Sequence, residues 1–284
     1  MTRADKNKNE NIDARRSVER FRELKTLEKQ WQDETGYELI EQSYNNKGSR
    51  LIYYSQFYRL IEKMKAADGA RILEVGCGGG HFIKLAYDKF KSKNALCVGL
   101  DISVNLTRVE RNNNKRLFWV VADGEILPFG DDTFDIIIFN GSLHHMPDFT
   151  RAFTEAFRVI RKNGQILLQE PASTLFSRTV HHLLDPLVFK KVKYESPVDE
   201  FCKDSFRPQL LRKTITDAGY TFEESWHDFL AYPLTGCYAN SYFSKRPGLL
   251  LRILKIEKTL QKMFFFKVIC RFFSWRILIE IEMK

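Results

Sequence analysis

A glycine-rich run that begins with an acidic residue is the part of the sequence best suited to bind a small molecule. It reads Glu74-Val75-Gly76-Cys77-Gly78-Gly79-Gly80 and ends a short apolar stretch. Glycines between a strand and a helix allow backbone N–H groups to approach a ligand closely. The dinucleotide pattern Gly-x-Gly-x-x-Gly fails here, because His81 stands at the third glycine position. Glu74 would also repel a pyrophosphate, whereas it suits a ligand with an ammonium group.

Two more acidic residues follow apolar runs further along the chain. Asp101 follows Leu96–Leu100, and Asp123 follows Leu117–Ala122. A carboxylate at the first place can accept both hydroxyl protons of a ribose, and one at the second could bind the amino group of an adenine. Together with Glu74 they describe a nucleoside that carries an amino acid rather than a phosphate chain. Either aspartate could instead cap a helix or stand in a turn.

The elements that must position these residues are short apolar runs that alternate with segments of helical periodicity. The pattern predicts three helices, over Leu51–Met64, His81–Phe90 and Phe149–Arg161. The last of them is expected to stop at Asn163-Gly164. The apolar runs predict five strands, over Arg71–Val75, Leu96–Leu100, Leu117–Ala122, Phe134–Phe139 and Gln165–Gln169.

Strands that alternate with helices imply an α/β fold with a parallel sheet and helices on both faces. Such sheets bind ligands outside the carboxyl ends of their strands. Five polar residues stand at or near those ends, namely Glu74, Asp101, Asp123, Asn140 and Glu170. Asn140 precedes a glycine, and Asn-Gly is equally a turn signal. Further on, the sequence predicts a helix over Asp204–Ala218 and strands over Tyr220–Trp226 and Trp275–Glu282.

The chain divides into four parts by composition. Residues 1–66 are expected to form a charged, helical arm and lid, and residues 67–228 the core, with a cap insertion at 171–203. Residues 229–273 are expected to form a basic amphipathic insertion, and residues 274–284 the final strand of the sheet. Most of the net charge of +9 lies after residue 229. A uniformly basic nucleic-acid-binding core would show a different distribution, so nucleic acid is not an expected partner.

The charged N-terminal residues lack the apolar run of an ordinary secretory signal. The five cysteines are scattered and form no Cys-x-x-Cys pair, which fits a reducing cytoplasm and gives no support to structural zinc. We therefore expect a cytoplasmic protein without a bound metal.

Several consecutive motifs resemble those of class I S-adenosylmethionine-dependent methyltransferases. The glycine run resembles their first motif, Gly99-Leu100-Asp101-Ile102-Ser103 their second, and Ala122-Asp123-Gly124-Glu125 the start of their third. The runs at 134–148 and 158–165 complete a resemblance that covers roughly residues 68–170. It implies S-adenosylmethionine as the cofactor, S-adenosylhomocysteine as the product, and a doubly wound, Rossmann-like sheet of seven strands with a helical substrate cap. The cofactor-binding residues that follow are Glu74, Gly76, Gly78, Gly80, Asp101, Ile102, Asp123, Gly124 and Asn140.

The loop Ser142-Leu143-His144-His145-Met146-Pro147-Asp148 resembles that of sugar and natural-product O-methyltransferases. In that group the first histidine is proposed as a general base, with an acidic residue after the fifth strand. His144 and Glu170 occupy the matching places, and histidine titrates near neutral pH. A histidine here can also merely pack the loop, and His145 is a weaker candidate.

The acceptor is not identified by the sequence. We expect methyl transfer to a hydroxyl of a small-molecule or lipid-linked acceptor, with C- or N-methylation of a quinone or polyprenyl-type acceptor as the alternative. A nicotinamide oxidoreductase and a non-catalytic binding module with this fold are the rivals from other classes. Residues 249–273 interleave apolar and basic side chains, so they suit a membrane surface, the protein's own sheet or a dimer contact. The oligomeric state stays open.

Overall fold

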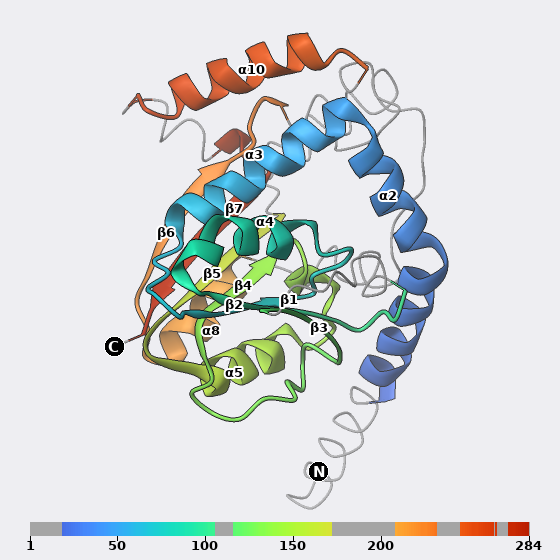
Figure 1. Cartoon of the computed structure of the whole chain (residues 1–284), viewed down its shortest axis with the longest axis vertical. Coiled ribbons are helices and arrows are strands. Elements are labelled where there is room, and N and C mark those ends of the chain that lie inside the picture. The colour runs from blue at the N-terminus through green and yellow to red at the C-terminus, as the bar shows by residue number, and fades with distance from the viewer. Residues whose placement is uncertain are drawn as a thin grey trace, which may run out of the picture.

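The computed structural model describes residues 19–105, 116–171, 208–231, 245–263, 265 and 272–283. Within these ranges, seven strands form one sheet in the order β3-β2-β1-β4-β5-β7-β6 (Figure 1). Their bounds are β1 Arg71–Val75, β2 Leu96–Asp101, β3 Leu117–Val121, β4 Phe134–Asn140, β5 Ile160–Pro171, β6 Phe222–His227 and β7 Arg276–Glu282. The sheet confirms the predicted α/β, seven-stranded fold.

The strand order reverses between β1 and β4, which are parallel neighbours. The pairs β1–β2, β2–β3 and β4–β5 are also parallel, whereas β7 lies antiparallel between β5 and β6. A ligand of such a sheet binds at the carboxyl ends of the strands beside the reversal. The ends of β1, β2 and β4 therefore define the place where the site is built.

Helices cover both faces of the sheet (Figure 1). Helical residues 19–31 lead into the π-helix η1 Gln32–Gly36 and then into α2 Tyr37–Asn45. The other described helices are α3 Lys47–Lys63, α4 His81–Phe90, η2 Lys91–Lys93, η4 Leu143–His145, α5 Phe149–Val159, α8 Pro208–Asp217 and α10 Pro247–Leu260. Helix α3 begins at the Asn46 cap, whose side chain accepts hydrogen bonds from the N–H groups of Gly48 and Ser49.

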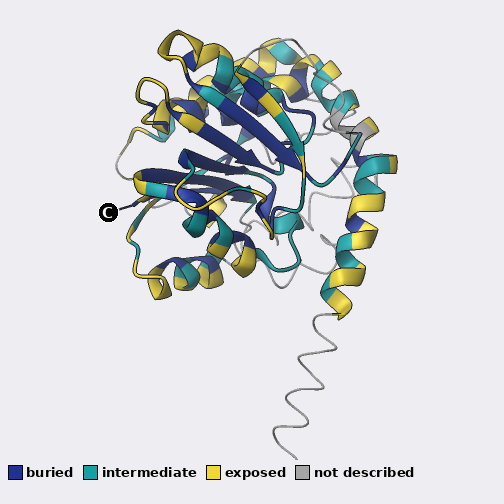
Figure 2. Cartoon of the chain, turned by 60° about the horizontal axis from the view of Figure 1, so that its bottom comes forward, coloured by how far each residue is buried: buried dark blue, intermediate teal, exposed yellow. Residues whose placement is uncertain are grey.

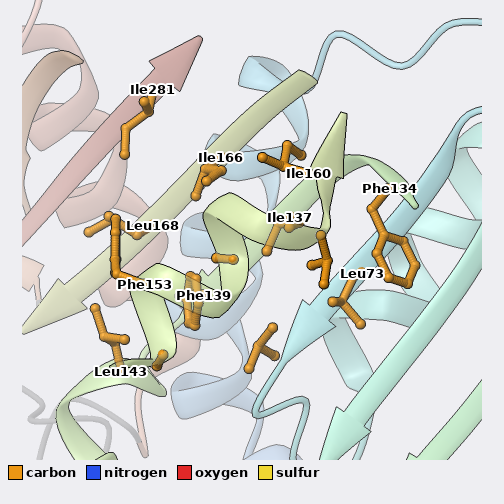
Figure 3. Close-up of a cluster of buried hydrophobic side chains, with 14 of the residues drawn as sticks. Leu73, Phe134, Ile137, Phe139, Leu143, Phe153, Ile160, Ile166, Leu168 and Ile281 are labelled. Atoms are coloured by element: carbon orange, nitrogen blue, oxygen red, sulfur yellow. The ribbon is translucent and has the colours of Figure 1, made fainter. Parts of the chain in front are cut away.

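The alternation of side chains along β4 shows how one apolar run serves two cores. Ile136 and Ile138 pack with α3 and α4 on one face, whereas Ile137 and Phe139 pack with α5 and α8 on the other. Figure 3 shows part of the second core, with Phe139 and Phe153 in contact. Because both faces are covered, the centre of the strand, 136–139, is apolar at every position rather than alternating, and the central strands of the sheet are mostly buried in Figure 2.

Several predicted boundaries differ from the structure: α3 begins at Lys47 rather than Leu51, and β5 runs over Ile160–Pro171 rather than Gln165–Gln169. The helix expected over Phe149–Arg161 ends at Val159, and Ile160 is already extended and pairs with Phe134 of β4. The buried, β-branched Ile160 gains a place in the sheet, so Asn163-Gly164 forms an irregularity within β5 instead of ending the helix. The predicted cap insertion at 171–203 lies outside the described residues except for Pro171, as do Asp204 to Arg207 of the predicted 204–218 helix.

Candidate cofactor and methyl-acceptor site

The glycine loop between β1 and α4 has a backbone conformation, and neighbours so close, that a residue with a side chain would not fit at two of its positions. Gly76 and Gly80 both have positive φ, at 72° and 75°. A Cβ at Gly76 would collide with Ser142, and one at Gly80 with the ring of Trp119. The loop is tied to β2 because the N–H groups of Gly76 and Cys77 donate to the carbonyl of Leu100, at 2.7 and 2.9 Å. The two glycines thus allow Ser142 and Trp119 of the same chain to lie directly against the loop.

Asp101 stands at the end of β2, where it fastens the loop. One carboxylate oxygen accepts from the N–H of Gly78 at 2.8 Å, and the other accepts from the N–H of Ser103 at 2.9 Å. Burial raises the pKa of Asp101 above its ordinary value, although both hydrogen bonds favour the charged form. The residue is therefore held in one orientation.

Glu74 is buried behind the loop. Burial raises its pKa well above the ordinary value, and hydrogen bonds from the Ile83 backbone and the Asn140 side chain oppose that shift. The Asn140 oxygen in turn accepts from Gln169 at 3.2 Å. One carboxylate oxygen of Glu74 has no hydrogen-bond partner among the described residues. A buried acceptor of this kind fits a ligand that brings a cationic donor.

A pocket opens at the carboxyl ends of β1, β2 and β4. Six of the nine predicted cofactor residues line it, namely Gly76, Gly78, Asp101, Ile102, Asp123 and Gly124. Glu74, Gly80 and Asn140 do not line it. The turn after β4 lines the pocket through Gly141 and Ser142 rather than through Asn140 itself.

The N-terminal helix, residues 19–31, covers this pocket, and sequence reasoning missed its residues. The ammonium of Lys25 lies 2.7 Å from an oxygen of Asp123 and 2.5 Å from an oxygen of Glu125. Partial burial opposes the charge of Lys25, but these hydrogen bonds raise its pKa above the ordinary value. Lys25 therefore forms an ion pair with Asp123, the residue whose carboxylate was predicted to bind an adenine amino group.

Two more contacts fix the same segment over the site. Glu28 lies 3.1 Å from Nδ1 of His145, and Asp33 accepts from the hydroxyl of Ser103. Lys25, Glu28 and Gln32 all line the pocket, and their spacing places them on one helical face. The sequence therefore indicated that these three side chains share a helical face. It did not indicate that this face meets the pocket, because that contact joins residues far apart in the chain.

Half-buried His144 and fully buried Glu170 form a pair beside the pocket. Nδ1 of His144 lies 2.7 Å from one oxygen of Glu170. The other oxygen accepts from the N–H groups of Ser142 and Leu143, at 3.1 and 2.9 Å. Burial opposes the charge of Glu170, yet the His144 contact and these amides hold its pKa below the ordinary value. The structure thus brings the two predicted catalytic residues together, whereas His145 is the histidine that lines the pocket.

Comparison with known proteins finds a family model and several relatives that are similar to part of this chain. Residues 73–168 match the family model described as a methyltransferase domain. The chain is 33% identical over 119 residues to the 27-O-demethylrifamycin SV methyltransferase of Amycolatopsis mediterranei, covering 39% of this chain and 42% of that one. It is 35% identical over 118 residues to a fatty-acid O-methyltransferase of Mycolicibacterium smegmatis, covering 40% and 42%. The chain thus spans less than half the length of these two relatives.

A third relative is matched over a longer stretch. It is the ubiquinone/menaquinone biosynthesis C-methyltransferase of Vibrio vulnificus, 26% identical over 189 residues, covering 62% of this chain and 71% of that one.

Solved structures agree on the fold. The plantazolicin methyltransferase BpumL, solved with a monoazolic desmethylPZN analog and SAH, has a TM-score of 0.54 at 12% identity, covering 94% of this chain and 99% of that one. Phospholethanolamine N-methyltransferase 2 of Haemonchus contortus has a TM-score of 0.51 at 14% identity, covering 81% and 52%. Residues 73–168 thus match a methyltransferase domain, and the glycine loop and strand order around them are those of a fold shared with solved methyltransferases.

Proposed function

We propose that this protein transfers a methyl group from S-adenosylmethionine to a hydroxyl oxygen of a small-molecule or lipid-linked acceptor. The pair formed by His144 and Glu170, 2.7 Å apart, is the observation that carries the proposal. A base of this kind is needed for a hydroxyl nucleophile, which must lose its proton as it is methylated.

The residues around the pocket fit the cofactor. Asp101, at the end of β2, has carboxylate oxygens suited to ribose hydroxyls. Glu74, the residue expected to meet the ammonium of the methionine part, is buried behind the loop and is not among the residues that line the pocket. Asp123 suits the adenine amino group once Lys25 leaves it. When bound, S-adenosylmethionine supplies a methyl group on a positively charged sulfonium.

The chemistry left to the chain is the transfer of one proton. Glu170 accepts a hydrogen bond from the Nδ1–H group of His144, which leaves the Nε2 lone pair available to take a proton from the acceptor hydroxyl. The imidazolium that forms is stabilised by the negative charge of Glu170. Two backbone amides hold that carboxylate in place, so the histidine is oriented before the acceptor arrives.

C-methylation of a quinone-type acceptor is the second candidate. The similarity to the ubiquinone/menaquinone biosynthesis C-methyltransferase, which covers 62% of this chain, favours it. A hydroxylated aromatic acceptor would also need deprotonation, so the same base would serve both reactions.

The test separates the cofactor site from the base. Calorimetry measures binding of S-adenosylhomocysteine and of NADH to the purified protein, and radiolabelled S-adenosylmethionine reports methyl transfer into extracts of the source cells. We expect S-adenosylhomocysteine to bind, NADH not to bind, and His144→Ala to keep that binding while turnover falls by roughly 10²–10⁴.

The matched control is His145→Ala, the neighbouring histidine, which should retain most of the turnover. Full activity of His144→Ala would refute the base. Absence of S-adenosylhomocysteine binding in the unaltered protein would favour a non-catalytic module, and NADH binding alone would favour an oxidoreductase.

A further inference from the structure

Helix α10, Pro247–Leu260, is anchored to the other described parts of the protein by one face. Leu250 is buried with Ile52 and Ala231 in a small core, and α10 packs against α3. The buried carboxylate of Glu257 accepts hydrogen bonds from the N–H groups of Phe229 and Ala231, at 3.0 and 2.9 Å. In Figure 1 the helix lies at the outer edge of the molecule, beyond α3. These contacts fix its orientation, so the composition of its outward face follows from the sequence.

The outward face carries an apolar stripe. Leu249, Ile256 and Met263 are spaced seven residues apart, so they lie along nearly one line of the helix and the turn that follows it. Their exposed fractions are 40%, 52% and 50%. Phe265, two residues after Met263, is 79% exposed. Large apolar side chains exposed in a row signal a contact that this surface makes.

Basic residues flank this stripe. Six exposed residues of the described range 245–263 are basic: Lys245, Arg246, Arg252, Lys255, Lys258 and Lys262. Glu257 is the acidic residue of that range, and it is buried against the protein. Every exposed ionisable side chain of the range is therefore positive. The partner of this face must accept positive charge as well as apolar side chains.

A second copy of this chain does not meet that requirement. A two-fold dimer brings the same patch of each copy together, which would place the positive side chains beside the stripe of one copy close to those of the other. An anionic lipid surface does meet it, because it attracts basic residues while its acyl region takes up the apolar ones. Among the described residues no helix has the length and hydropathy needed to cross a membrane.

We infer that α10 and Phe265 dock this protein onto an anionic lipid surface. The apolar stripe of Leu249, Ile256 and Met263 enters the boundary between head groups and acyl chains, and the basic residues beside it contact the head groups. This inference does not depend on the methyl acceptor, because it concerns a face of α10 that contributes nothing to the pocket.

The experiment is co-sedimentation of the full chain with vesicles. One set contains phosphatidylcholine alone and the other equal parts of phosphatidylcholine and phosphatidylglycerol. We expect the unaltered protein to bind the anionic vesicles at least about tenfold more tightly, and less so at high salt. Binding to neither set, or equal binding to both, would overturn the inference.

Two variants test the two parts of the face. L249S/I256S/M263S removes the apolar stripe, and R252E/K255E/K262E reverses three charges beside it; each should weaken binding to the anionic vesicles at least about tenfold. The matched control is K89E/K162E/K213E, which makes the same charge change at exposed lysines on α4, in β5 and on α8. An equal loss in the control would show that net charge alone is responsible and would refute the assignment to α10.

Two further readouts keep the result interpretable. Circular dichroism and binding of S-adenosylhomocysteine should be unchanged in all three variants, so a failure of the cofactor site is seen separately. A dimer in sedimentation velocity that the apolar variant abolishes would instead assign the face to a second copy. Tighter binding to a single-stranded RNA than to the vesicles would assign it to nucleic acid.

Discussion

Replacing Glu170 with glutamine tests the pairing with His144 while the side chain stays in place. The oxygen of Glu170 that accepts from Ser142 and Leu143 is retained in the amide. The other oxygen, 2.7 Å from Nδ1 of His144, becomes an NH2 group. Because an NH2 group only donates, Nδ1 must then be unprotonated and the proton of the neutral ring moves to Nε2.

The expected effects on activity and stability differ strongly. A ring that carries its proton on Nε2 cannot accept one there, so turnover should fall by roughly 10²–10⁴. Stability should change by only about 1–2 kcal/mol, because both backbone hydrogen bonds remain and only charge assistance is lost. Glu170→Ala differs, since it leaves two buried N–H groups without their acceptor at about 1–3 kcal/mol each, or roughly 2–6 kcal/mol in total.

The assay does not need the acceptor. Nitrogen-15 NMR of the imidazole of His144 distinguishes the two tautomers directly, with His145→Ala used to assign the signals. Urea unfolding of the unaltered protein, Glu170→Gln and Glu170→Ala gives the order of stability. An unchanged His144 tautomer in Glu170→Gln would refute the orienting role of Glu170. Equal stability of the glutamine and alanine variants would refute the structural role of its two amide contacts.

Three further changes address the cofactor pocket and α10. Asp101→Asn turns one acceptor of Asp101 into a donor, so calorimetry should show S-adenosylhomocysteine binding weakened by about 1.5–3 kcal/mol; unchanged affinity would remove Asp101 from the ribose site. Lys25→Met removes two partly exposed ion pairs worth about 0.2–1 kcal/mol each, so the same ligand should bind roughly two- to thirtyfold more tightly, with Lys29→Met as the control and weaker binding as the contrary result. Burial raises the pKa of Glu257 to about 7, so its contribution to stability is fully present below the unfolded pKa near 4.5 and is lost as pH rises through 7. Urea unfolding should show the stability of the unaltered protein relative to Glu257→Gln falling by about 3 kcal/mol between pH 4 and 8, and a difference that does not vary with pH would contradict this.

The fold was predictable because its central strands are buried on both faces. A short run of apolar, β-branched residues such as that within Phe134–Asn140 is typical of a buried strand of a parallel sheet. Glycines or acidic residues mark the ends of these runs. The final strand was predictable from the alternation of Ile277, Ile279 and Ile281 with Glu280 and Glu282. Even so, Glu280 is buried, because Lys63 and Gln165 pair with its carboxylate. That pairing joins residues far apart in sequence, which periodicity does not reveal.

The closure of the pocket was not predictable for the same reason. Lys25 and Asp123 are separated by 98 positions, and a lysine on a charged helix is most often solvated. The end of α5 was mispredicted because Asn163-Gly164 is a strong local stop signal, whereas the pairing of Ile160 with Phe134 is a contact across the sheet. Tertiary contacts decided both cases.

The two adjacent histidines show how local geometry separates roles that the sequence leaves merged. They lie in the 3-10 helix η4, where successive side chains point about 120° apart. The two rings still lie against each other, with centroids 4.1 Å apart, but their Nδ1 atoms have different partners. His144 faces Glu170 beneath the end of β5, and His145 faces the pocket and Glu28 of the N-terminal helix. His144 is accordingly the residue whose proton a carboxylate controls, and His145 connects the pocket to the helix that covers it. A substitution of His145 should therefore change the rate of cofactor binding more than the rate of methyl transfer.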